Sequence, residues 1–426
     1  FRNHKLAWHT EVSKLSKVYG PVFTLWIGPL PFVFICDLDM GRQAFTKCEF
    51  SGRIDIKYAK SKALSEVVDE NVRQMIDNIT RDVAINTPFK PKLYSYNMFV
   101  NIMGDAMFSK KINNNQDVKM KIKYTITDFH TDLGALLFIY QFVPVLRYLM
   151  ANPMAKYRQY FNDLMNYTRD IYQTHDKTHD CESLRDFCDI LIAAKHKAIA
   201  NEKQTAPYLT DDNLPAAMVD MLIGGTETTQ TTFLWSLLFI AFYPDYQDKL
   251  RDEINNELGD CMPVIEDKSK LNYTMAFISE ILRYKNPFPI GVPHKMLDDS
   301  KLGDFTVLKN TLIVFHQASV MTDPKYWTNA DKFEPDRFLD NHGQFLKTKP
   351  TAYIPFSYGR RTCLGESLAI NNLFLVLVRF IQLTNEYRME LYNDHDIQRT
   401  LDAFEPELDS VWLQMPKPYQ IIFRSL

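Results

Sequence analysis

The stretch FSYGRRTCLGESLA, from Phe356 to Ala369, places a single cysteine between arginines and glycines. The apolar residues 364–381 that follow predict a long buried helix. Cys363 would then lie at the helix N-terminus, where unpaired N–H groups and the positive end of the dipole stabilise a thiolate. No second cysteine follows at C-x-x-C spacing, and the nearest upstream is Cys261, which argues against a paired zinc or redox site.

The residues around this cysteine leave room for a flat, bulky group and offer a partner to a carboxylate. Gly359 permits a tight turn before the sulfur, and Gly365 leaves room for a bulky planar group to approach the backbone. Arg361 offers a bidentate fork to a carboxylate near the sulfur. The alternative at this point is a buried structural cysteine at a helix start.

A second candidate site lies at the centre of a long helix expected over about 212–242. Apolar runs flank the polar sequence from Gly224 and Gly225 through Glu227 and Thr228. Two glycines in a helix interior cost about 1 kcal/mol each relative to alanine. The pattern therefore predicts that a small molecule lies against bare backbone, with an acid and a hydroxyl beside it. The alternative is a polar helix stripe whose threonines bond back to the helix backbone.

The elements that must position these residues form one large, mainly α fold with a minor β region. Residues 22–28 and 32–37 predict a hairpin around the sequence PLP, helical patterns dominate from about 61 to 243, and short strands and turns follow Pro287. Glycine is only 14 of 426 residues, and no Gly/Ser-rich linker or repeat separates domains. We therefore expect a single domain over 1–426.

Composition narrows the class of protein. A net charge of −3 gives no indication of nucleic-acid binding, and aromatic residues at 13% suit a large apolar interior or an apolar ligand. Six scattered cysteines indicate free thiols in a reducing compartment.

The sequence printed here contains neither a signal peptide nor an anchor. Its most apolar stretch, Leu133 to Met150, is short and interrupted by polar residues, and predicts a buried or interfacial helix rather than a bilayer span.

The spacing Phe356-x-x-Gly359-x-Arg361-x-Cys363-x-Gly365 resembles the haem-binding signature of the cytochrome P-450 haem-thiolate monooxygenases, and every position matches. The resemblance implies that Cys363 is the proximal ligand of a haem b iron, to which its thiolate donates electron density. It also implies that Phe356 packs beside the sulfur and that Arg361 binds a haem propionate.

Further motifs of this family follow in the expected order. Glu280 and Arg283 match the E-x-x-R pair, whose side chains share a helix face at this spacing. Arg337 in the F-x-P-x-R-F segment is implied to join them in a buried structural cluster.

Glu227 and Thr228 match the acid and threonine that relay protons during oxygen activation. His294 resembles a propionate contact of the microsomal enzymes, with a solvated surface histidine as the alternative. The residues implied to line the substrate pocket are Gly224, Gly225, Phe288, Ile290 and Val292, and core packing is the alternative for the last three.

Two features depart from the family pattern. The membrane anchor is not in this sequence, and none of the five tryptophans has arginine four residues later, so the family's Trp-x-x-x-Arg helix is missing. The chain between Arg53 and Ser61 is also too short for the usual loop and helix. Either a segment near 57–60 is missing from this sequence or the protein is genuinely shortened, and the spacing of consecutive Cα atoms there would distinguish the two.

The resemblance predicts a monooxygenase that inserts one atom of dioxygen into a small lipophilic substrate such as a xenobiotic, steroid or fatty acid. Electrons would come from NADPH through a flavoprotein reductase, at the cytosolic face of the endoplasmic reticulum membrane. Two alternatives remain: a haem-thiolate isomerase or dehydratase, and a shortened, non-catalytic haem-binding form. The intact Glu227–Thr228 pair argues against the isomerase, which needs no proton relay.

Overall fold

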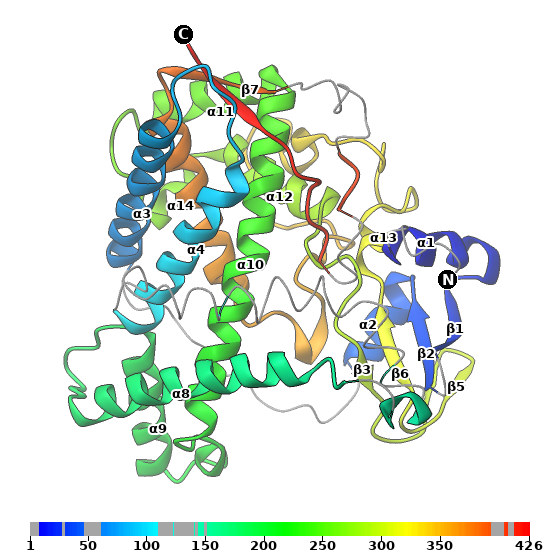
Figure 1. Ribbon diagram of the computed structural model, residues 1–426. Helices are drawn as coiled ribbons and strands as arrows, with labels where there is room; N and C mark the ends of the chain where they lie inside the picture. The colour runs from blue at the N-terminus through cyan, green and yellow to red at the C-terminus, as the bar shows by residue number, and fades with distance from the viewer. Residues whose placement is uncertain are drawn as a thin grey trace.

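The computed structural model describes residues 8–27, 30–46, 61–109, 122, 140, 144–148, 151–392, 404–407 and 413–426. Within these ranges helices form the body of the protein and most of the short strands lie at one side (Figure 1), which confirms the predicted mainly α fold with a minor β region. The α-helices are α1 (Trp8–Tyr19), α2 (Leu38–Thr46), α3 (Ser61–Asp82), α4 (Pro91–Phe108), α8 (Ala155–Lys177), α9 (Phe187–Ala200), α10 (Asn213–Phe242), α11 (Pro244–Glu257), α12 (Asn272–Tyr284), α13 (Gln317–Met321) and α14 (Glu366–Leu383).

The strands form a four-stranded sheet, in the order β1-β2-β6-β3, and two hairpins, β4-β5 and β7-β8. The predicted hairpin around PLP is present as the antiparallel pair β1-β2. Strand β6 then joins β2 in parallel, with Phe34 opposite Val314, and so ties the start of the chain to its last third. The strands are β1 (Val22–Ile27), β2 (Leu30–Ile35), β3 (His294–Lys295), β4 (Ser300–Leu302), β5 (Phe305–Val307), β6 (Leu312–Phe315), β7 (Tyr387–Leu391) and β8 (Ile421–Ser425).

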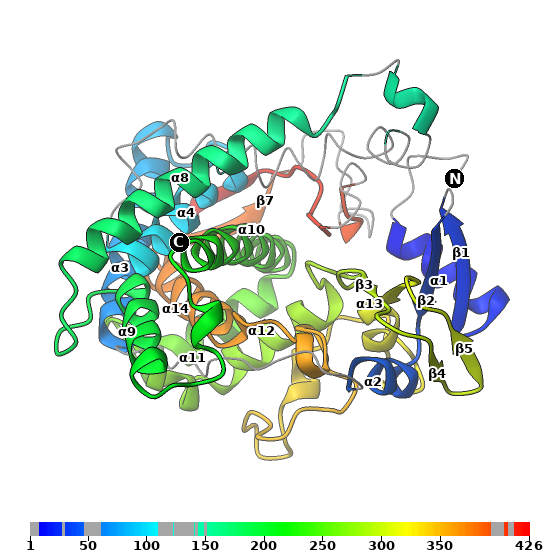
Figure 2. The ribbon, with the colours of Figure 1, turned by 90° about the horizontal axis from the view of Figure 1, so that it is seen from below.

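Helix α10 runs through the middle of the helical part, and Figure 2 shows it nearly end-on among α4, α12 and α14. Its C-terminal half, 229–241, is buried on all faces, because the sequence there is apolar all round apart from small hydroxyl and amide side chains. The helix ends at Phe242 because Tyr243 precedes a proline and takes an extended conformation, with φ −113° and ψ 96°. Pro244 then starts α11.

Helix α14 is the second core helix, and it begins two residues later than the sequence pattern suggests. Residues 371–382 are buried against α3, α10 and α12. In the described part of the chain, α14 is the one helix whose length and composition would suit a membrane span, but 61% of it is buried inside the protein. Burial of this kind is typical of a core helix.

Two regions discussed above fall largely or wholly outside the described residues. One is the short junction near 57–60. The other is the apolar stretch 133–150, of which the structure describes residue 140 and the 3₁₀ turn η3 (Pro144–Tyr148).

Candidate functional site

The cysteine loop holds its sulfur at the surface of the polypeptide, just before α14. Cys363 is exposed, and its backbone N–H donates to the carbonyl of Phe356 over 2.9 Å, which closes the loop on itself. The chain reverses through Ser357 and Gly359, whose φ angles are +67° and +77°. Gly365 caps α14 two residues after the sulfur.

The loop is anchored to α2 by a close contact between Gly359 and Phe45. A Cβ at position 359 would lie 2.0 Å from the Phe45 carbonyl oxygen. Glycine is therefore required both by its φ angle and by this approach of the two backbones. Arg42, one turn earlier on α2, lies over the ring of Tyr358 at 5.2 Å and donates to the Thr351 carbonyl.

The approach to the sulfur is open on the side of Gly365. A Cβ at this position would lie 3.8 Å from the Cys363 sulfur, so any larger side chain there could cover it. Leu364 next to it is 68% exposed despite its apolar side chain. An exposed sulfur beside an exposed leucine indicates a face that a bound apolar group would cover.

A histidine and an arginine lie at the edge of this face. His294, on β3, packs against the Phe45 ring with centroids 4.3 Å apart. Burial lowers the pKa of His294, and the positive charge of Arg361 lowers it further, so the two side chains are close enough to interact. At neutral pH the site therefore presents one fixed cation and one neutral imidazole, which together suit hydrogen bonding to carboxylates.

The two glycines of α10 face different surroundings. No atom lies within 4 Å of the position that a Cβ on Gly224 would take, so the helix backbone borders open space there. A Cβ on Gly225 would instead lie 2.5 Å from the Met103 methyl group of α4. Gly224 thus has the surroundings predicted for a pocket residue, whereas Gly225 allows α4 to pack closely against α10.

Thr228 lies on the Gly224 side of α10, one turn later. It is half-buried, and its hydroxyl donates to the Gly224 carbonyl over 2.5 Å. Glu227 is only 3% exposed. The predicted acid and hydroxyl are therefore adjacent in the chain but differ in environment: one faces the protein interior, the other the open side of the helix.

The predicted three-residue cluster is assembled in the structure. Glu280 and Arg283 on α12 have fully buried side chains and form a bidentate pair, with N–O distances of 2.7 and 2.8 Å. Arg337, in the 3₁₀ turn η6 (Pro335–Phe338), donates to the same carboxylate over 3.0 Å. Arg283 also donates to the Met321 and Ala330 carbonyls. The cluster fixes the irregular segment that leads to the cysteine loop.

The remaining candidate pocket residues do not share one environment. Ile290 is 3% exposed and packs in a small core with residues of α1, β1, β2 and β6, which agrees with the core-packing alternative. Phe288 is half-buried, and Val292 is 65% exposed. Only the latter two could contact a bound molecule without rearrangement.

Two residues that position the site were missed by the sequence analysis. Phe45 contacts both His294 and the turn at Gly359, and Met103 fills the space left by Gly225. Neither the residue type nor the sequence spacing distinguishes Phe45 and Met103 from other apolar residues, because each acts through a contact with a segment far away in the chain.

The arrangement fits a haem b group. The exposed Cys363 thiol suits an iron ligand, the open approach at Gly365 suits a planar macrocycle, and Arg361 with His294 suits its propionates. Gly224 and Thr228 would then border the space on the other side of such a group.

Comparison with known proteins agrees with this fit. A family model described as Cytochrome P450 matches residues 56–423. Cytochrome P450 2C23 of Rattus norvegicus is 26% identical, over 96% of this chain and 88% of the rat protein. Cytochrome P450 2U1 of Mus musculus is 31% identical, over 88% of this chain and 77% of the mouse protein. The rat alignment runs over 448 positions, more than the 426 residues of this chain, so the relative has residues without a counterpart here.

The family match covers both the cysteine loop and helix α10. Its members are haem b enzymes that combine a substrate, dioxygen and electrons from a reductase partner. This chain belongs to the cytochrome P450 family of monooxygenases.

Proposed function

We propose that this protein hydroxylates small lipophilic compounds, such as xenobiotics, steroids or fatty acids, with electrons delivered from NADPH by a flavoprotein reductase. The observation that carries the proposal is the open side of α10, where bare backbone at Gly224 and the Thr228 hydroxyl face the same space. An isomerase has no use for a hydroxyl placed there, whereas an enzyme that consumes protons during oxygen activation does.

Four residues would hold the haem, which supplies the iron centre where dioxygen is activated. The Cys363 thiolate would bind the haem iron, and the hydrogen bond from the Cys363 N–H to the Phe356 carbonyl keeps the loop in place. Arg361 and the neutral His294 would each bind a propionate. Gly365 would keep the sulfur accessible, since its missing side chain leaves the approach free.

Thr228 and Glu227 would manage protons. The Thr228 hydroxyl donates to the Gly224 carbonyl, which leaves its oxygen free to accept a hydrogen bond on the open side. Glu227 precedes it on the buried side of α10 and would deliver protons from the interior. The pair thus combines a proton source with a positioned hydroxyl.

The surroundings of the site support a lipophilic class of substrate. Phe288 and Val292 are accessible candidate pocket residues with side chains, and both are apolar. Burial of an apolar ligand against such side chains contributes about 25 cal/mol per Å² of surface removed from water.

We further propose that the protein works at the cytosolic face of the endoplasmic reticulum membrane. Trp26 on β1 and Tyr148 on η3 are 68% and 92% exposed, and aromatic side chains of this kind favour the membrane–water interface. A membrane location would also give the enzyme access to lipophilic substrates.

A carbon-monoxide difference spectrum, combined with NADPH oxidation in the presence of reductase, tests the proposal. We expect the red-shifted band of a thiolate-ligated haem in the parent protein and in the control Cys261→Ser, whose cysteine is also exposed. Cys363→Ser should lose that band, because a neutral hydroxyl cannot replace the thiolate. A full band in Cys363→Ser would refute the ligand assignment.

Product analysis with a panel of fatty acids and steroids then separates the activities. Oxygenated product that depends on NADPH and reductase supports hydroxylation. Conversion of a peroxide substrate without NADPH would favour the isomerase, and an intact band with no turnover would favour a non-catalytic haem binder.

A further inference from the structure

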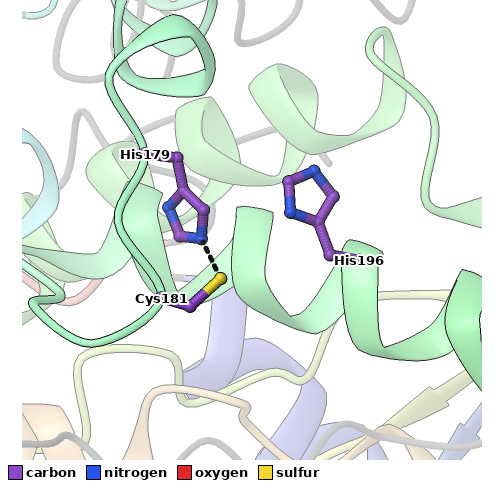
Figure 3. Close-up of side chains that lie close together, drawn as sticks. All are labelled: His179, Cys181 and His196. Atoms are coloured by element: carbon purple, nitrogen blue, oxygen red, sulfur yellow. Dashed lines mark hydrogen bonds between the residues drawn. The ribbon is translucent and has the colours of Figure 1, made fainter.

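The loop between α8 and α9 brings two histidines and a cysteine together on the side of the helical part away from the sheet. His179 and Cys181 lie in the loop, and His196 lies on α9 (Figure 3). One ligand atom from each lies within 4.8 Å of the other two. The Cys181 sulfur is 3.6 Å from His179 Nε2, and the two imidazole rings are 5.4 Å apart.

We propose that His179, Cys181 and His196 bind a zinc ion that ties the α8–α9 loop to α9. Two imidazoles and a thiolate form a ligand set typical of Zn²⁺. In tetrahedral zinc sites with bonds of about 2.0–2.3 Å, neighbouring ligand atoms are about 3.3–3.8 Å apart. The observed spacing of up to 4.8 Å must shorten by about 1.5 Å or less, which rotation of the exposed Cys181 and His196 side chains supplies.

In each histidine, the ring nitrogen that would point away from the metal lies near a carboxylate. The Nδ1 atom of His179 lies 3.8 Å from Asp189, and Nε2 of His196 lies 3.9 Å from Asp176. Ligating histidines in metal sites commonly direct the second nitrogen to a carboxylate, which orients the ring. His179 is 4% exposed, and its Nδ1 is buried without a hydrogen bond, so a small shift of the ring toward Asp189 would satisfy it.

The carboxylate behind His179 is itself held rigidly. Asp189 is fully buried and accepts two hydrogen bonds from the Arg185 guanidinium, at 2.7 and 2.8 Å, and a third from the Arg185 backbone N–H. Arg185 also donates to Thr178, the residue before His179. These hydrogen bonds therefore fix the loop next to the His179 ring, which would bind the metal, and not next to the exposed Cys181 thiol.

A neighbouring group of three potential ligands lacks these properties. Both ring nitrogens of His175 already have partners, the Asp186 carboxylate at 2.8 Å and the Ile171 carbonyl at 3.0 Å. Burial, and then the negative charge of Asp186, raises the pKa of the Cys188 thiol far above its usual range. That group is a structural cap of α9, whereas Cys181 and His196 are exposed and accessible to a metal ion from solution.

The experiment uses the full haem-loaded chain without an affinity tag, stripped with a chelator, given one equivalent of zinc and gel-filtered. X-ray absorption fine structure at the zinc edge identifies the atoms bound to zinc without interference from the haem iron. We expect one sulfur at about 2.3 Å and nitrogen ligands at about 2.0–2.1 Å. The same spectrum is expected for the control Cys261→Ser, which removes an exposed cysteine elsewhere.

Cys181→Ser should lose the sulfur contribution. His196→Gln alters an exposed helix residue, so folding should survive, and it should weaken zinc binding at least tenfold in competition with a chromophoric chelator. Asp176→Asn should weaken binding about tenfold through the ring of His196. The carbon-monoxide spectrum should not change in any of the three.

A parent spectrum without sulfur, a sulfur contribution that persists in Cys181→Ser, or zinc affinity unchanged in His196→Gln would each overturn the proposal. If Cys181→Ser does not fold, the His196→Gln comparison decides alone.

Discussion

The Phe45 carbonyl oxygen occupies the space that any side chain at Gly359 would need, 2.0 Å from the position of a Cβ. Gly359→Ala should therefore displace the cysteine loop from α2 and abolish most haem incorporation. Gly343→Ala is the matched control, because Gly343 has φ +74° but no atom within 4 Å of its Cβ position. It carries only the left-handed backbone cost, about 1–2 kcal/mol. Haem content and the carbon-monoxide band measure the difference. Equal haem loss in both variants would mean that strain alone, and not the contact with Phe45, governs position 359.

Thr228→Ala should uncouple electron consumption from product formation. A group positioned for proton transfer typically contributes about 10²–10⁴-fold, so product per NADPH should fall and hydrogen peroxide rise while haem binding is kept. Thr226→Ala is the control, since its hydroxyl makes the same bond to the carbonyl four residues back but is fully buried. Parent-level coupling in Thr228→Ala would assign Thr228 to packing.

Glu280→Gln should destabilise the protein by about 3–5 kcal/mol, because it leaves the fully buried Arg283 without its counter-charge and removes one of the two carboxylates that pair with Arg337. Glu334→Gln is the control. Its carboxylate also contacts Arg337, at 3.2 Å, but is 39% exposed, and exposed pairs contribute about 0–1 kcal/mol. Urea unfolding measures both variants, and losses of similar size would show that the charge of Glu280 has no special role.

His316 should contribute to acid unfolding. Burial, and then the nearby His9, lowers the pKa of the fully buried His316 to about 3. Between the ordinary pKa of 6.5 and about 3, the unfolded chain binds a proton that the folded chain does not, so this contribution to stability is present above pH 6.5 and is lost on acidification. Within this window the free energy of unfolding falls by about 1.4 kcal/mol for each pH unit of acidification.

His316→Asn should therefore reduce the pH dependence of the unfolding free energy by about one proton over that window. His342→Asn, which changes an exposed histidine, should leave the slope unchanged. An unaltered slope in His316→Asn would contradict the assignment. Because burial lowers the pKa of His9 to about 4, some acid sensitivity should remain in the variant.

Local sequence was enough to predict several elements of the fold. The hairpin β1-β2, the helix α10 and the helix after Cys363 depend on apolar periodicity, turn residues and prolines within a few positions. The sequence also predicts a functional role for Gly224 and Gly225 from their stability cost in a helix; the structure shows open space only at Gly224, whereas Gly225 packs against Met103.

Tertiary structure decided how these elements meet. That Gly359 lies against Phe45, that Gly225 lies against Met103 while Gly224 borders open space, and that Ile290 belongs to the core all depend on contacts between segments distant in sequence. The convergence of Cys181 with two histidines from a loop and a helix is of the same kind, since the sequence showed only scattered thiols. Spacing along a chain reports neighbours within one element, whereas the packing of elements sets which side chains face one another across the interior.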